Sequence, residues 1–284
     1  MEINDELKDV DIPDNFIVEY IELSDRTQLR HLYYHPENSR GRILLYPGMN
    51  TLVLSWVKVL NLLSELNYSI DYIESREKMS AIYTDNSTIS KERMIQDCVE
   101  VCNLLGLEGN NYLVLASSLG ATTVIYAMAQ NEIFPSNVVL VGPTTEFRVP
   151  LTIRLLLPVT NYWTYRNIGK KILKQIVMRK FTDEKADPFQ KKKYSLALDL
   201  ADPVRLKKCI RAWYKTTIYN EFPLIDGKRS FCYLIGASED KLHPDRDSKL
   251  ASESIENAKF IDLKTNSAAH DKPLIDLIDK TIMN

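Results

Sequence analysis

The sequence predicts an α/β protein built on a doubly wound, mostly parallel β-sheet with an inserted helical cap. Short apolar runs rich in β-branched and aromatic residues recur along the chain, and amphipathic windows with helical spacing lie between most of them. This alternation stops between residues 146 and 228. A chain of 284 residues with 45% hydrophobic content can bury one large core. We therefore expect a core of residues 1–145 and 229–284 and a helical cap of residues 146–228.

The individual elements follow from local pattern. Apolar runs bounded by Asp, Asn, Gly or Pro indicate strands that begin near Phe16, Leu29, Ile43, Ile70, Tyr112, Val138, Phe231 and Phe260. Apolar residues at helical spacing predict core helices over 52–66, 91–105, 247–256 and 274–283, and cap helices over 151–157, 168–180, 189–198 and 203–219. Parallel βαβ units place a ligand site off the carboxyl ends of the strands.

One uncharged stretch is about as long as a membrane span. Residues 109–130 contain no charged side chain, but the middle of the stretch is polar. A strand over 112–116, a turn over 117–120 and a helix over 121–130 explain it better, because a polar centre suits a sharp turn rather than lipid.

The cysteines and the first residues indicate a reduced, cytoplasmic chain. Cys98, Cys102, Cys209 and Cys232 form no CxxC pair and have no nearby histidine to complete a zinc set, so we expect four small buried thiols and no metal site. The acidic start, MEINDELKDVDIPD, lacks the basic n-region followed by an apolar run that a secretory signal needs.

The charge balance hides an internal asymmetry. Lys+Arg 36 against Asp+Glu 38 gives a formal charge of −2, so no overall basic field exists to hold nucleic acid. Between residues 146 and 228, however, 18 basic residues face 8 acidic ones, so the cap carries +10 and the rest −12. An anionic carrier or an anionic lipid surface fits such a cap. Solvation of helix faces, including the run Lys191 to Lys193, is the competing explanation.

The segment Ala116-Ser117-Ser118-Leu119-Gly120 carries the main chemical signal. It is a small-x-Ser-x-small pentapeptide at a predicted strand-to-helix junction. Small residues two before and two after the serine are needed where the strand and helix backbones approach, and the helix N-terminus offers amide hydrogens to an oxyanion. Ser118 is therefore the candidate nucleophile, with a simple packing turn as the alternative.

An acid and a base follow in the order that such a nucleophile needs. Asp240 comes just after the strand that begins at Phe231, where a carboxylate could orient an imidazole, and Glu239 and Glu146 are alternative acids at strand ends. His270 lies on the loop between the last strand and the last helix. The other three histidines fit the role of base less well: His31 and His35 belong to the N-terminal hairpin, and His243 is too close in sequence to Asp240.

Donors for a developing oxyanion are expected after the strand that begins at Ile43. This strand runs into Pro47-Gly48-Met49 just before a helix, and Gly48 allows the backbone to turn its amides toward the site. The amides of Met49 and Leu119 are the candidate pair, while a plain strand-to-helix turn is the alternative.

These residues together resemble the α/β-hydrolase family of esterases, lipases and thioesterases. The resemblance rests on the elbow at Ser118, the acid at Asp240 in a D-x-L-x-P context and the base at His270, and it covers the chain from about Phe16 onward. The cap falls where that family commonly inserts one. Two positions depart from the family pattern: Tyr46-Pro47-Gly48 replaces the usual His-Gly, and Ala121 replaces a second glycine.

The resemblance implies a serine hydrolase that acts on a carboxylic ester or thioester without a cofactor. The elbow also looks like that of bacterial acyl-carrier-protein thioesterases of the luminescence type, so an acyl-CoA or acyl-carrier thioesterase or acyltransferase is the enzyme alternative. A binding protein that keeps the fold without turnover is the other. We expect an acyl pocket beneath the cap, lined by apolar residues of the first cap segment, namely Leu151, Ile153, Leu155, Leu156, Leu157, Tyr162, Trp163 and Tyr165.

Overall fold

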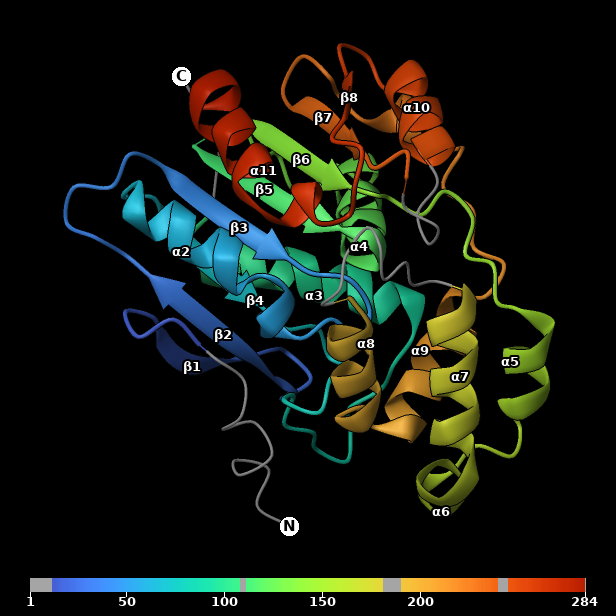
Figure 1. Ribbon diagram of the computed structural model, residues 1–284. Helices are drawn as coiled ribbons and strands as arrows, with labels where there is room; N and C mark the ends of the chain where they lie inside the picture. Colours follow the sequence, from blue (N-terminus) through green and yellow to red (C-terminus); the bar gives the residue numbers. More distant parts are fainter. Residues whose placement is uncertain (1–11, 108–110, 181–189, 240–244, 284) are drawn as a thin grey trace.

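A single sheet of eight strands organises the molecule (Figure 1). The computed structural model describes residues 12–107, 111–180, 190–239 and 245–283. The strands are β1 (Ile17–Glu22), β2 (Gln28–Tyr34), β3 (Arg42–Tyr46), β4 (Ser69–Ile73), β5 (Tyr112–Ser117), β6 (Asn137–Val141), β7 (Phe231–Gly236) and β8 (Lys259–Asp262). Their order across the sheet is β1-β2-β4-β3-β5-β6-β7-β8. Because β2 is antiparallel to β1 and β4 and the other neighbours are parallel, the predicted doubly wound, mostly parallel sheet is confirmed.

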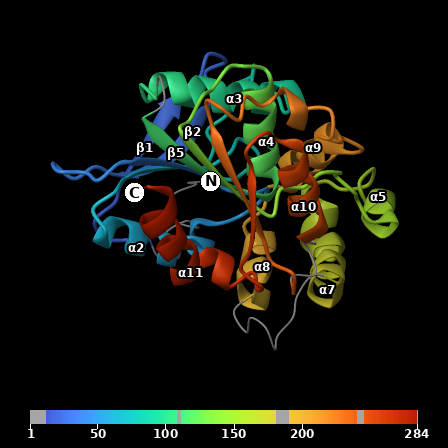
Figure 2. The ribbon, with the colours of Figure 1, turned by 90° about the horizontal axis from the view of Figure 1, so that it is seen from above.

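Helices cover both faces of this sheet (Figures 1 and 2). The short turn η1 (Val53–Ser55), α2 (Val57–Glu65), α11 (Lys272–Leu277) and the π-helical turn η5 (Ile278–Ile282) lie on one face, and α3 (Lys91–Leu104), α4 (Ser118–Ala129) and α10 (Asp245–Ser254) lie on the other. Side chains of the buried strand β5 alternate between two cores: Leu113 and Leu115 pack toward α2 and α11, whereas Val114 and Ala116 pack toward α3 and α4. The uncharged run of the sequence is therefore a strand and a helix that are both buried.

The helix α4 begins three residues earlier than its sequence pattern predicts. Eleven of its twelve residues are buried, all but Ser118 at its start, so the absence of charge reflects burial against the sheet and α3. Among the described residues, no helix has both the length and the apolar character needed to cross a membrane.

The cap consists of short helices that lie beyond the arrowhead of β3 (Figure 1). They are α5 (Leu151–Leu156), α6 (Tyr162–Thr164), the π-helical turn η2 (Tyr165–Gly169), α7 (Lys170–Lys180), α8 (Gln190–Asp199), α9 (Pro203–Trp213) and the turn η3 (Phe222–Leu224). The helix predicted over 203–219 ends at Trp213, because the following residues pair instead with the entry to the cap: Phe147 donates to the carbonyl of Thr216, at 2.9 Å. The division into core and cap at residues 146 and 228 stays a prediction.

All four cysteines are buried and free, as the sequence predicts. Cys98 and Cys102 lie one helical turn apart on α3. Burial raises the pKa of the Cys209 and Cys232 thiols, so these side chains behave as small apolar groups rather than as nucleophiles.

A buried carboxylate ties β2, β3 and β4 together at the edge of the parallel part of the sheet. Oδ1 of Asp71 accepts hydrogen bonds from Nε2 of His31 and of His35, each at 3.0 Å, and Oδ2 accepts from Nε of Arg42 at 2.7 Å. Burial by itself opposes ionisation, but these three hydrogen bonds outweigh it and hold the pKa of Asp71 well below its usual range. Two of the four histidines are thus structural.

Replacing this carboxylate tests its contribution to stability. Asp71→Asn removes the buried negative charge that faces the Arg42 guanidinium and places an amide among three hydrogen-bond donors, so we expect it to lower the free energy of unfolding by about 3 kcal/mol at neutral pH. Because the folded-state pKa is depressed, the contribution of Asp71 is present above the ordinary aspartate pKa and is lost as pH falls below it. Urea unfolding at neutral and at acidic pH measures both effects. Asp276→Asn, at a half-exposed position on α11, should change stability by less than about 0.5 kcal/mol.

Candidate active site

Ser118 lies on a sharp turn between β5 and α4. Its φ is +48°, in the left-handed region that a serine adopts only when the surrounding structure holds it there. The strand ends at Ser117 and the helix begins at Ser118, so the side chain stands at the carboxyl edge of the sheet and at a helix N-terminus. This is the geometry of a nucleophile elbow.

The small residue after the serine is required by a close backbone contact. A Cβ on Gly120 would lie 2.3 Å from the carbonyl oxygen of Tyr46 and 2.5 Å from that of Pro47. Neither oxygen belongs to a flexible side chain that could move aside. The first turn of α4 therefore packs directly on the end of β3, and only glycine fits there.

The loop after β3 lies against the elbow. The amide of Gly48 donates to Oγ of Ser117 at 3.1 Å, and a Cβ on Gly48 would lie 3.0 Å from Cβ of Ser118. Met49 and Ser118 line the same cavity. The structure therefore brings the loop of one candidate donor next to the candidate nucleophile, while the use of the Met49 and Leu119 amides as an oxyanion hole stays a prediction.

A buried glutamate, which is not among the predicted site residues, holds this loop in place. Oε1 of Glu77 accepts from the amide of Asn50 at 3.1 Å, and Nδ2 of Asn50 donates to the carbonyl of Ala197 on α8 at 3.0 Å. Asn50 itself has a φ of +52°, a conformation that asparagine tolerates better than most residues. The available signal was the run Glu74-Ser75-Arg76-Glu77-Lys78 directly after β4, which is too highly charged for an ordinary buried turn.

His270 enters the same cavity from the opposite side. It ends the short turn η4 (Ala268–His270), and its ring lies 4.5 Å from the ring of the buried Trp56. Nδ1 is 2.9 Å from the carbonyl oxygen of Asn266. Because a carbonyl only accepts, Nδ1 carries the hydrogen, and Nε2 of the neutral ring is then the nitrogen that can take up a proton.

The cavity that Ser118 and His270 share lies at the carboxyl ends of the central strands. Its volume is about 120 Å³. It is lined by the loop after β3, the ends of β5, β6 and β7, α8 of the cap and the turn before α11. The lining residues are Met49, Thr51, Ser55, Ser117, Ser118, Val141, Gly142, Gln190, Lys193, Tyr194, Ile235, Ala237, Asn266, Ala269 and His270. This is the place where a doubly wound sheet binds its ligand.

The cap contributes to this cavity with a different segment from the one predicted. Leu151, Leu155, Tyr162 and Trp163 are each more than 60% exposed, and none of them lines the cavity. These four residues therefore do not line an acyl pocket next to Ser118 as expected: α5 and α6 lie at the outer edge of the cap, whereas α8 covers the site (Figure 1). An acyl pocket lined by the less exposed Ile153, Leu156, Leu157 and Tyr165 stays a prediction. Lys193, from the run of three lysines, is a lining residue.

The predicted acid, Asp240, and the alternative base His243 lie outside the described residues. The two alternative acids are both placed elsewhere. Glu146 forms an ion pair with Arg148 at the entry to the cap, and Glu239 is exposed. Neither of these carboxylates lines the cavity of Ser118 and His270.

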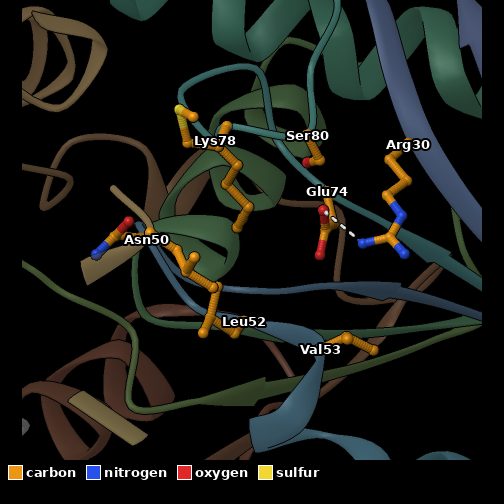
Figure 3. Close-up of a pocket in the computed structure, with 9 residues that line it drawn as sticks. Arg30, Asn50, Leu52, Val53, Glu74, Lys78 and Ser80 are labelled. Carbon is orange, nitrogen blue, oxygen red and sulfur yellow. Dashed lines mark ion pairs between the residues drawn. The ribbon is translucent and has the colours of Figure 1, made fainter. Parts of the chain in front are cut away.

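A second, smaller cavity lies on the other side of the loop after β3. Asn50, Leu52 and Val53 line it, and Figure 3 shows Arg30 and Glu74 on another part of its wall, 3.8 Å apart. Its volume of about 20 Å³ suits about one water molecule. Nη1 of Arg30 and Oγ of Ser80 find no hydrogen-bond partner within the part of the chain that the structure describes, so we expect water there. The cavity is too small for an acyl substrate.

Comparison with solved structures identifies the fold. A hydrolase from Pseudomonas aeruginosa superposes with a TM-score of 0.73 at 13% identity, covering 91% of this chain and 94% of that one. An esterase from Exiguobacterium antarcticum gives 0.71 at 17% identity, with 87% and 90% covered, and an enol-lactonase from Burkholderia xenovorans gives 0.70 at 16%, with 93% and 98% covered. The chain therefore has the α/β-hydrolase fold. No protein-family model and no curated protein sequence matches it.

The contact at Gly120 gives a direct test of the elbow. Gly120→Ala forces a Cβ against two backbone carbonyls, and we expect it to lower the free energy of unfolding by about 1–3 kcal/mol although alanine favours helices. The matched control is Gly169→Ala, whose Cβ would meet its nearest neighbour at 3.4 Å. Urea unfolding of both variants measures the difference. Equal stability of the two variants would show that the elbow is not tightly packed on β3.

Proposed function

We propose that this protein is a serine hydrolase that cleaves a carboxylic ester or thioester. The observation that carries the proposal is that Ser118, held at a positive φ on the turn between β5 and α4, shares one cavity with His270. The fold supports it, since the similar structures include proteins described as an esterase, a hydrolase and an enol-lactonase. The chemistry needs no cofactor.

In the proposed reaction, Oγ of Ser118 attacks the carbonyl carbon and its proton passes to Nε2 of His270. The carbonyl π electrons move to oxygen, and the amides of Met49 and Leu119 donate to the resulting oxyanion, each lowering the barrier by about 3 kcal/mol. Collapse of this intermediate breaks the bond to the leaving alkoxide or thiolate, which takes the proton from His270. Water then attacks the acyl-enzyme by the same route and releases the acid.

We assign the triad acid to Asp240, which follows β7. Its role is to stabilise the imidazolium that forms on His270. The Asn266 carbonyl already holds Nδ1 of His270 in its protonated form, so orientation of the ring does not rest on the acid alone. A carbonyl dipole supplies less stabilisation of a cation than a full carboxylate charge does.

Among acyl donors, a phosphate-bearing thioester such as an acyl-CoA is favoured by Lys193. This lysine lines the cavity of Ser118, and α8 also carries Lys191 and Lys192. Transfer of the acyl group to another nucleophile and ligand binding without turnover are the alternatives. The first experiment below separates ligand binding from both reactions, because hydrolysis and transfer share the serine nucleophile.

Labelling with a fluorophosphonate tests the nucleophile. We expect the folded wild-type protein to be labelled, Ser118→Ala to lose all labelling and Ser254→Ala, at an exposed position on α10, to keep it. Turnover of a p-nitrophenyl ester should fall by about 10⁵-fold or more in Ser118→Ala and in His270→Ala. No labelling of well-folded wild-type protein would point to a binding protein instead.

The assigned acid gives a quantitative expectation. Where the acid alone fixes the histidine tautomer, its conversion to an amide costs about 10⁴-fold in kcat. Because the Asn266 carbonyl also fixes Nδ1, Asp240→Asn should cost only about 10²-fold. Steady-state kinetics of Asp240→Asn, with Glu239→Gln and Glu146→Gln as controls, measure this. Full activity in Asp240→Asn together with a large loss in either control would reassign the acid.

The charge of Lys193 predicts a dependence on salt. kcat/KM for an acyl-CoA should fall as ionic strength rises, and Lys193→Gln should lower it about three- to tenfold at low salt. A neutral ester of the same chain length should respond to neither change. Lys192→Gln, at an exposed position that does not line the cavity, is the matched control. Equal salt sensitivity for charged and neutral substrates would contradict the prediction.

A further inference from the structure

The first part of the cap combines exposed apolar side chains with unbalanced positive charge. Residues 147–180 contain eight Lys and Arg residues and no Asp or Glu. Of the fourteen large apolar side chains that stand exposed within the described residues, seven fall between 151 and 172. They are Leu151, Leu155, Val159, Tyr162, Trp163, Ile168 and Ile172. Single exposed apolar residues are ordinary, but a concentration of this kind marks an interaction surface.

Five of these side chains, from Leu151 to Trp163, lie on or between the short helices α5 and α6. No residue of α5 or α6 is buried. Leu151 and Leu155 lie one turn apart on α5, so they share a face, and Figure 1 shows this helix at the outer edge of the cap. Within the described residues, no other element covers Leu151 and Leu155.

Exposed cations lie among these apolar residues. Arg154 is on α5, Arg166 follows Trp163 by three residues, and Lys171 is the second residue of α7. All three are exposed. We give the name outer cap surface to the exposed side chains of this stretch, namely Leu151, Arg154, Leu155, Tyr162, Trp163, Arg166, Ile168 and Lys171. Leu and Trp beside Arg and Lys is the composition of protein surfaces that lie in the headgroup region of a bilayer.

We propose that the outer cap surface docks the protein on an anionic lipid bilayer. Its cations would contact the lipid phosphates while Leu151, Leu155 and Trp163 enter the headgroup and upper acyl region. The charge of the remainder of the chain supports one orientation: a body of −12 is repelled by the membrane that attracts a cap of +10, so the molecule approaches cap first. This docking does not depend on the proposed catalytic role of Ser118.

Charge also argues against a second copy of the chain as the occupant. A two-fold interface would place the same patch on itself and bring Arg154, Arg166 and Lys171 of one copy near the same cations of the other. An acidic carrier protein would match the charge. However, the two exposed leucines one turn apart on α5 need only an apolar medium rather than a complementary protein surface, and the acyl region of a bilayer supplies one.

The tryptophans provide a built-in probe. The chain has three, of which Trp56 and Trp213 are fully buried and Trp163 is 68% exposed. Sedimentation and tryptophan fluorescence with vesicles of phosphatidylcholine containing about one third phosphatidylglycerol test the proposal. We expect binding that weakens with salt, a blue shift of the emission, quenching by brominated lipid, and no binding to pure phosphatidylcholine. Ser118→Ala should bind as well as the wild type.

Matched variants distinguish binding through the outer cap surface from non-specific adsorption to vesicles. Leu151→Ser with Leu155→Ser should lower the partition coefficient at least about tenfold. Arg166→Gln with Lys171→Gln should lower it about fivefold for each charge removed. Leu104→Ser with Leu224→Ser, at positions 58% and 60% exposed on α3 and η3, is the control and should bind normally.

Four outcomes would overturn the proposal. They are no binding to anionic vesicles, equal binding by the leucine variant and the control variant, a dimer of the wild type that the leucine variant converts to a monomer, or binding of a purified acyl carrier protein through the outer cap surface in place of vesicles. None of these results bears on fluorophosphonate labelling of Ser118, so the two proposals fail separately.

Discussion

The backbone of Gly120 packs against the carbonyl oxygens of Tyr46 and Pro47, and the geometry of the cavity follows from this contact. It sets the first turn of α4 directly on the end of β3, so the chain must leave β5 through a turn too tight for a normal φ at Ser118. The same closeness brings Gly48 against Ser118. The strained conformation is therefore supported by the neighbouring strands, which are buried on both faces and cannot easily shift.

A second set of contacts connects this elbow to the cap. The loop after β3 is held on one side by Ser117, through the amide of Gly48, and on another by Glu77, through the amide of Asn50. The side chain of Asn50 continues the connection to the Ala197 carbonyl on α8, a helix that also lines the cavity with Lys193. A shift of α8 would therefore act on the loop that carries the Met49 amide as well as on the cavity opening. This couples the cap to the candidate oxyanion site through one asparagine.

The fold could be predicted from the sequence almost completely, because its signals are local. Each strand is a short apolar run with a breaker at both ends, and β5 with α4 shows how an uncharged run resolves once a polar turn divides it. The helix α9 was predicted too long because Thr216 and Thr217 pair with the cap entry, a contact between residues about 70 positions apart that no local pattern reports. Ser118 and His270 were found through turn chemistry and order along the chain, and the structure places both in one cavity. Glu77 was missed because its role comes only from tertiary contact with Asn50.

The cap shows more clearly what amino-acid composition and spacing cannot predict. Apolar residues at helical spacing predict that a face of α5 is buried, but they cannot say against what, and the structure leaves Leu151 and Leu155 in solvent. The basic residues of the cap likewise lie in different surroundings. Lys170 and Lys174 pair with Asp199 inside the cap, Lys193 lines the cavity, and Arg154, Arg166 and Lys171 stand among exposed apolar side chains. Of these three groups of described cations, the outermost one combines cations with unburied apolar surface. Solvation of helix faces explains why arginines and lysines lie there. It does not explain why Leu155 and Trp163 are exposed beside them.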